Sequence, residues 1–222
     1  MRGDPAPESP ICCSQDFDGL FDSVEAQHDL DAYHETGPPA ASRRLIALLT
    51  AEGIVGATVI DVGAGVGVVH LELLAAGAAF AVDVDASHAF LQVAAEEAQR
   101  QDRSAQVEHH YGDFVLVAPS IARADVVTLD RVICCYPRVA ELLDAAAGRA
   151  RQLIGIVHPV DTWWSRSGAA VFNAISDLFR RRHHFYVHRR RTVDSALATG
   201  GFEPLARERA GFWEVSVYRA AG

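Results

Sequence analysis

The chain has 222 residues, half of them hydrophobic, which suits a single α/β domain with a modest appendage. Its formal net charge of −9 disfavours binding to nucleic acid or anionic membranes, and no apolar run approaches the roughly 20 residues of a membrane helix. The first ten residues lack a secretory signal, and the four cysteines form two adjacent pairs without zinc-like or disulfide-like spacing, so we expect a cytoplasmic protein with reduced thiols and no metal site.

The N-terminal part of the chain is predicted to be a short arm followed by two helices. Residues 1–15 show no apolar pattern, and we expect them to be disordered. Apolar residues then recur at helical spacing over 17–33, a Gly-Pro-Pro sequence interrupts the pattern, and residues 40–52 give a second helix. We expect residues 16–52 to form a helical cap over the domain that follows.

Residues 53–222 alternate between strand-like and helical segments, with a helical insertion near 161–185. The predicted strands cover residues 58–62, 79–84, 106–111, 125–129, 152–157, 203–207 and 212–218. This alternation predicts a Rossmann-like three-layer α/β sandwich, with a mostly parallel seven-stranded sheet whose last strand is antiparallel. Such sheets bind ligands at the carboxyl ends of their strands.

A glycine-rich turn after the first strand is the strongest motif, and it reads Asp61-Val62-Gly63-Ala64-Gly65-Val66-Gly67. Glycines let the backbone approach a ligand, and the helix that follows begins with unpaired N–H groups. A dinucleotide-binding turn reads G-x-G-x-x-G/A, but Val68 occupies the third small position here, and the Asp61 carboxylate would oppose a pyrophosphate. The motif therefore favours a cationic nucleotide that has no phosphate.

This turn and the acidic positions after later strands resemble the class I S-adenosylmethionine-dependent methyltransferases over about residues 40–222. The resemblance implies that the turn holds the methionine part of S-adenosylmethionine, with S-adenosylhomocysteine as the product. It implies a ribose-binding acid at the end of the second strand, where we favour Asp85 and keep Asp83 as the alternative. The cofactor contacts implied in this way are Asp61, Gly63, Ala64, Gly65, Gly67, Asp83, Asp85, Ala86, Gly112, Asp113, Phe114 and Asp130. Taken singly, each acid also suits a helix cap or a turn.

The stretch from Thr128 to Pro137 is similar to that of the magnesium-protoporphyrin O-methyltransferases, where a Leu-Asp strand end leads to His-Tyr-Pro. Cys135 stands here in place of that histidine, so the resemblance does not extend to the porphyrin acceptor. The candidates for proton removal or alignment of the acceptor are His158, Tyr33 and Asp130. The candidates for contact with the acceptor are His34, Cys134, Cys135, Tyr136, Trp163 and Trp164.

The sequence thus predicts methyl transfer to a small molecule, with an oxygen acceptor favoured. One alternative is a soft acceptor, a thiol or a trivalent arsenical, held by the Cys134-Cys135 pair, although adjacent cysteines also serve as small apolar fillers. Another is a protein that binds S-adenosylmethionine without catalysis. A nucleic-acid methyltransferase is disfavoured because Asp130-Arg131-Val132 replaces the usual Asn/Asp-Pro-Pro-Tyr/Phe. We expect a bacterial monomer or homodimer with no nucleic-acid or membrane partner.

Overall fold

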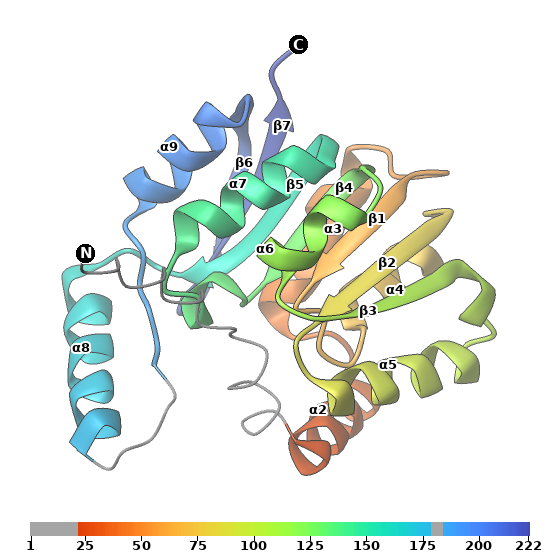
Figure 1. The fold of residues 1–222 in the computed structure, drawn as a ribbon, viewed down its shortest axis with the longest axis horizontal. Coiled ribbons are helices and arrows are strands. Elements are labelled where there is room, and N and C mark those ends of the chain that lie inside the picture. Colours follow the sequence, from red (N-terminus) through yellow and green to blue (C-terminus); the bar gives the residue numbers. More distant parts are fainter. Residues whose placement is uncertain (1–21, 179–183) are drawn as a thin grey trace, which may run out of the picture.

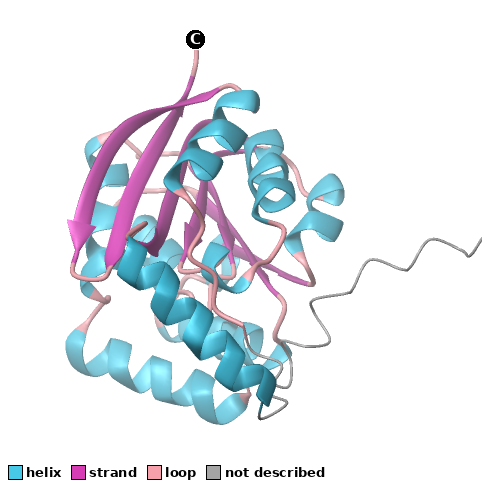
Figure 2. Ribbon diagram, turned by 90° about the vertical axis from the view of Figure 1, so that its left-hand side faces the viewer, coloured by secondary structure: helices cyan, strands magenta, loops and turns pink. Residues whose placement is uncertain are grey.

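The computed structural model describes residues 22–178 and 184–222, which form a seven-stranded sheet with helices on both faces (Figures 1 and 2). The strands are β1 (Thr58–Val62), β2 (Phe80–Asp85), β3 (Val107–Tyr111), β4 (Ala124–Asp130), β5 (Ala150–Pro159), β6 (Phe202–Ala210) and β7 (Trp213–Ala220). The main helices are α2 (Ser23–Thr36), α3 (Ala40–Ala51), α4 (Val68–Ala75), α5 (His88–Arg100), α6 (Phe114–Val117), α7 (Val139–Arg149), α8 (Trp163–Leu178) and α9 (Arg190–Thr199). Short 3₁₀ turns include η3 (Ile133–Cys135).

The sheet has the strand order β3-β2-β1-β4-β5-β7-β6, and β1 to β5 pair in parallel. Strand β7 is antiparallel to both of its neighbours, β5 and β6. The predicted three-layer sandwich with a reversed last strand is therefore confirmed. The strand order reverses at β1 and β4, because β2 and β3 follow outward on one side and β5 on the other, so a crevice is expected at the carboxyl ends of β1 and β4.

Alternate residues of each strand face opposite helical layers, as the two-residue period of a strand requires. Helices α3, α4 and α5 cover one face, where Leu45 and Leu71 pack on Val59 and Val126. Helices α7 and α9 cover the other face, where Leu143 and Leu197 pack with strand residues such as Ile60 and Ile154. Helix α3 thus packs flat on β5 and β7, and its Leu45 fills the space above Gly155.

The boundaries of several elements differ from those expected. Helix α2 begins at Ser23, because the Asp22 side chain accepts from the backbone N–H groups of Val24 and Glu25. It ends at Thr36, before the capping residue Gly37, which has φ +71°. The predicted arm and the start of the predicted first helix lie outside the described residues. Helix α6 was not predicted, because a single turn is too short to show a helical period.

Helices α2 and α8 lie beyond the carboxyl edge of the sheet, at separate places along it (Figure 1). Helix α2 is tied down by Tyr33, whose hydroxyl donates to Glu72 at 2.8 Å, and by His34, whose Nε2 lies 2.9 Å from Glu97 Oε2. Burial would raise the pKa of Glu97, but hydrogen bonds, the strongest from Arg100, lower it to about 2. No helix among the described residues is long and apolar enough to cross a bilayer.

Candidate functional site

Two adjoining cavities lie at the carboxyl ends of β1, β2 and β4, of about 250 and 120 Å³. They share five lining residues: Asp29, Gly63, Gly65, Asp130 and Arg131. The larger cavity extends along the ends of β2 and β3, whereas the smaller one lies between the glycine-rich turn and α2. The shared lining makes them two parts of one elongated site.

The glycine-rich turn between β1 and α4 lines both cavities. Gly63 and Gly65 both have φ +59°, and Gly67 has φ +86°, values that other residues rarely adopt. A Cβ on Gly63 would also lie 2.7 Å from Val132 Cγ2. Glycine at 63 is thus required both by the backbone angle and by the close approach of the loop after β4.

Asp85 lies at the end of β2 and lines the larger cavity together with Ala86. Its carboxylate accepts from Gly65 N at 3.0 Å and from Ser87 N at 2.9 Å. Burial and the nearby charge of Asp83 raise the pKa of Asp85 to about 7, against these hydrogen bonds. Asp83, two residues earlier, is fully buried and bonds to His109 Nδ1 at 2.8 Å, so it does not reach the cavity.

Asp113 follows β3 and lines the same cavity between Gly112 and Phe114. The Tyr136 hydroxyl donates toward both of its carboxylate oxygens, at 3.1 and 3.0 Å, and Val115 N donates to Oδ1 at 3.0 Å. Tyr136, expected to contact the acceptor, therefore uses its hydroxyl to hold Asp113, while its ring lines the cavity.

Asp130, at the end of β4, lines both cavities. It accepts from the Ser42 hydroxyl at 2.5 Å and lies 3.3 Å from Arg131 Nε. Burial raises the pKa of Asp130 above its ordinary value, although Arg131 and Ser42 oppose the shift. A carboxyl group of raised pKa beside a cavity is suited to accepting a proton.

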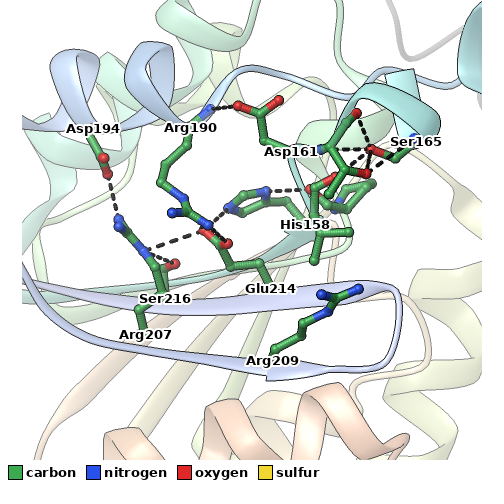
Figure 3. A network of polar contacts seen from close by, with 12 residues as sticks. His158, Asp161, Ser165, Arg190, Asp194, Arg207, Arg209, Glu214 and Ser216 are labelled. Atoms are coloured by element: carbon green, nitrogen blue, oxygen red, sulfur yellow. Dashed lines mark hydrogen bonds and ion pairs between the residues drawn. The ribbon is translucent and has the colours of Figure 1, made fainter. Parts of the chain in front are cut away.

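The three other candidates for catalysis or acceptor binding near the N-terminal helix and β5 have different surroundings. Tyr33 lines the smaller cavity, but burial and its bond to Glu72 raise its pKa to about 12, which makes it a donor and not a base. His34 faces Glu97 on α5, away from both cavities. His158 lines neither cavity, and its buried ring packs beside Glu214, with Nε2 3.7 Å from Oε1 (Figure 3).

The environment of His158 is a polar network between β5, β7 and α9. Arg190 pairs with Glu214 through two hydrogen bonds, and Arg207 joins Glu214 to Asp194 (Figure 3). Burial lowers the pKa of His158, so its ring is neutral near pH 7, and its Nδ1 lies 3.0 Å from Pro159 O. These contacts tie the reversed strand to the rest of the sheet.

The cysteines and tryptophans lie at two different places. Cys135 lines the larger cavity, and its Sγ is 3.9 Å from that of the buried Cys134. The contact between the two sulfur atoms raises the pKa of Cys134 and lowers that of Cys135. Trp163 and Trp164 lie on α8 and are 74% and 45% exposed, so neither is a core residue.

Asp29, Phe90 and Arg131 are among the lining residues to which the sequence pattern assigned no role. Asp29, an exposed residue of α2, and Phe90, a buried residue of α5, both line the larger cavity. Arg131 directly follows Asp130 and has φ +62°, which is unusual for arginine. Its position after a strand-end acid was the one available signal in the sequence, because backbone angles cannot be read from it.

Comparison with known proteins identifies a methyltransferase domain in the part of the chain that holds the cavities. Residues 60–152 match the methyltransferase-domain family. No match was found among curated proteins.

Several solved structures share the fold. The magnesium protoporphyrin IX methyltransferase of Synechocystis PCC 6803, with bound S-adenosylhomocysteine, aligns with a TM-score of 0.75 at 18% identity, over 94% of this chain and 99% of that one. An O-methyltransferase family protein from Burkholderia thailandensis aligns with a TM-score of 0.70 at 17% identity, over 91% of this chain and 62% of that one. A putative RNA methyltransferase from Pyrococcus horikoshii aligns with a TM-score of 0.62 at 16% identity, over 82% and 84%.

At these identities the solved structures establish the fold and leave the acceptor open, since they include enzymes for different acceptors. The matched domain covers the glycine-rich turn and the ends of β2, β3 and β4, where the cavities lie. Residues 60–152 thus match a methyltransferase domain, and the chain has the fold of solved methyltransferases that bind S-adenosylmethionine or S-adenosylhomocysteine.

Proposed function

We propose that this chain transfers the methyl group of S-adenosylmethionine to an oxygen atom of a small molecule. The observation that carries the proposal is a row of four carboxylates at the ends of four neighbouring strands. They are Asp113, Asp85, Asp61 and Asp130, after or in β3, β2, β1 and β4, and each lines one or both of the joined cavities. A row of acids beside a glycine-rich turn repels a diphosphate and suits a sulfonium nucleotide.

The side chains fit the parts of this donor. Asp61 and Arg131 both line the smaller cavity, and together they offer opposite charges to the ammonium and carboxylate groups of an amino acid. Asp85 offers carboxylate oxygens to the ribose hydroxyls. Asp113, fixed by Tyr136, offers an acceptor to the adenine amino group, and Phe114 gives apolar surface.

The bound donor supplies a methyl group already activated by the positive sulfur. The protein then has to align the acceptor, exclude water and take up the proton of a weak nucleophile. We assign proton uptake or alignment to Asp130, because it is the catalytic candidate that lines both cavities and has a carboxyl group of raised pKa. In this proposal His158 stabilises the pairing of β5 with β7, and Tyr33 holds α2 in place.

We assign the acceptor side of the site to α8 and to residues 184–188. Tyr186 N donates to Cys134 O, which joins this segment to η3 beside the larger cavity. A groove of about 320 Å³ lies against α8, lined by Trp164, Phe172, Phe185 and Phe212 among others. This apolar surface favours an acceptor with a hydrophobic carbon skeleton.

A soft acceptor is the second candidate, and the position of Cys135 in the larger cavity favours it. The lowered pKa of Cys135 would help it bind a thiophilic centre. Against this candidate, the neighbouring Cys134 is buried and lines neither cavity. We therefore rank this reaction below O-methylation.

The test is a binding measurement followed by an acceptor screen. Calorimetry should detect binding of S-adenosylmethionine and S-adenosylhomocysteine but no binding of NAD. Labelled donor should then methylate members of a panel of phenols and carboxylic acids, and Asp130→Asn should lower kcat while leaving the affinity for S-adenosylhomocysteine intact. Transfer to thiols or arsenite, abolished by Cys135→Ser, would favour the second candidate. Failure to bind either nucleotide would refute both, and binding without transfer to any acceptor would favour a non-catalytic role.

A further inference from the structure

Polar side chains form a row across the sheet beneath α4. Thr128, Asp61, Asp83 and His109 occupy partnered positions on β4, β1, β2 and β3, and they face the same side of the sheet. Thr128 and Asp83 are fully buried, and Asp61 is 1% exposed. Burying carboxylates is costly unless hydrogen bonds or opposite charges compensate, so this row requires a partner.

His70, on the first turn of α4, supplies that partner for Asp61 and is itself fully buried. Its backbone N lies 3.2 Å and its Nδ1 lies 3.1 Å from Asp61 Oδ2. An ionised carboxylate only accepts hydrogen bonds, so Nδ1 carries the proton. The Thr128 hydroxyl donates to the other oxygen, Oδ1, at 2.6 Å.

These contacts leave the Asp61 carboxylate with limited capacity to accept further hydrogen bonds. A carboxylate has about four acceptor positions, two on each oxygen. His70 uses both positions on Oδ2, and Thr128 uses one on Oδ1. One position on Oδ1 remains, and Asp61 lines the smaller cavity beside Gly63 and Gly65.

His70 also contacts the glycine-rich turn itself. A Cβ added to Gly67 would lie 2.9 Å from Cε1 and Nε2 of the His70 ring, so the ring packs directly against this glycine. The ring thus fixes the acid and the end of the loop at the same time. Nε2 has no hydrogen-bond partner among the described residues, which leaves the Asp61 contact as the polar anchor of the ring.

The charges around the ring favour the same arrangement. Burial lowers the pKa of His70, but the bond to Asp61 and the charges of Asp83 and Asp61 outweigh it and raise the pKa above 6.5. Burial raises the pKa of Asp83, against the bond from His109. The two acids thus favour the charged form of the His70 ring, against the effect of its burial.

We propose that His70 is a positioning residue that directs the one free acceptor position of Asp61 toward the ammonium group of the donor. It acts through Asp61 and not by contact with the donor. The inference rests on the proposed function, because it assigns a ligand group to the smaller cavity. It predicts that His70 affects only ligands that carry an amino-acid part.

The experiment compares two ligands and two substitutions. S-adenosylhomocysteine carries the ammonium group, whereas 5′-methylthioadenosine has the same nucleoside and a thioether but no amino-acid part. His70→Leu removes the ring donor at similar size, and His70→Asn keeps an N–H near the position of Nδ1. Thr128→Val and Thr128→Ser form a matched second pair that removes or keeps the hydroxyl.

We expect His70→Leu to weaken S-adenosylhomocysteine binding by about tenfold to a hundredfold, the loss of a hydrogen bond to a charged group. Binding of 5′-methylthioadenosine should stay unchanged, and His70→Asn should recover most of the lost affinity. Equal weakening of both ligands, or no weakening of either, would overturn the inference. If His70→Leu does not fold, the Thr128 pair decides by the same comparison. Failure of the unaltered chain to bind either ligand would refute the proposed function instead.

Discussion

Replacing Asp85 by Asn tests the ribose contact and the electrostatics of the site together. The Asp85 carboxylate accepts from Gly65 N and Ser87 N, and its remaining acceptor capacity is available to the ribose hydroxyl groups. Asn keeps one oxygen but turns an NH₂ group toward a backbone N–H or toward the ligand. A hydrogen bond to a charged group contributes about 1.5–3 kcal/mol, so losing one or two of them should weaken S-adenosylhomocysteine binding by roughly a hundredfold.

The raised pKa of Asp85 adds a dependence on pH. Burial, followed by the charge of Asp83, raises this pKa from 3.8 to about 7, and ligand hydroxyls bind best to the ionised form. Affinity should therefore fall as the pH decreases below about 7, by about tenfold per unit and about a hundredfold at pH 5. The Asp85→Asn variant should lack this dependence.

The same pKa shift also predicts that ionisation of Asp85 lowers the stability of the fold, although it raises the affinity for the ligand. A carboxyl group whose folded pKa exceeds its unfolded pKa destabilises the fold as the pH rises between the two values. The shift from 3.8 to about 7 corresponds to at most about 4 kcal/mol at neutral pH. Asp85→Asn removes this cost, so its free energy of unfolding at pH 7.5 should equal or exceed that of the unaltered chain.

The assay is calorimetry with S-adenosylhomocysteine from pH 5 to 8, with urea unfolding of each variant. Asp102→Asn is the matched control, because Asp102 is exposed and Asn tolerates its φ of +57°. The reasoning is refuted if Asp85→Asn binds about as tightly as the control, or if the affinity of the unaltered chain is the same at pH 5 and pH 8.

Three further predictions concern packing, the adenine side and the α2–α5 contact. Gly155→Ala should cost about 1–3 kcal/mol in urea unfolding, since its Cβ would lie 2.6 Å from Leu45 Cδ1, and the cost should shrink in a Leu45→Ala background. Tyr136→Phe should weaken S-adenosylhomocysteine about tenfold by freeing the Asp113 carboxylate, without loss of stability beyond about 1 kcal/mol; unchanged affinity would contradict this role. Hydrogen bonds lower the pKa of Glu97 to about 2 despite its burial, so its carboxylate should stabilise the fold above pH 4.5. This part of the free energy of unfolding should be lost as the pH falls toward 2, and Glu97→Gln should not show that loss.

The sequence by itself determined the order of strands and helices along the chain, and its motifs predicted a donor site at the carboxyl edge of the sheet. Apolar periodicity is a local property, so the seven strands could be located to within a few residues, and a parallel sheet brings the ends of its strands to one edge. The glycine-rich turn needed no tertiary information either, because Gly63 and Gly65 mark a backbone that other residues cannot adopt.

Only the tertiary structure decided which polar side chains face the cavities. Asp83 and Asp85 lie on one strand two residues apart, and the sequence favoured Asp85 for the ribose contact but kept Asp83 as an alternative. Asp83 is in the middle of the sheet and bonds to His109, whereas Asp85 is where the chain leaves it, beside the cavity. His158 likewise ends a strand but bonds within a network that includes Glu214 from the reversed strand. Such partners come from distant parts of the chain, and side-chain direction depends on where they lie, so local patterns could not supply it.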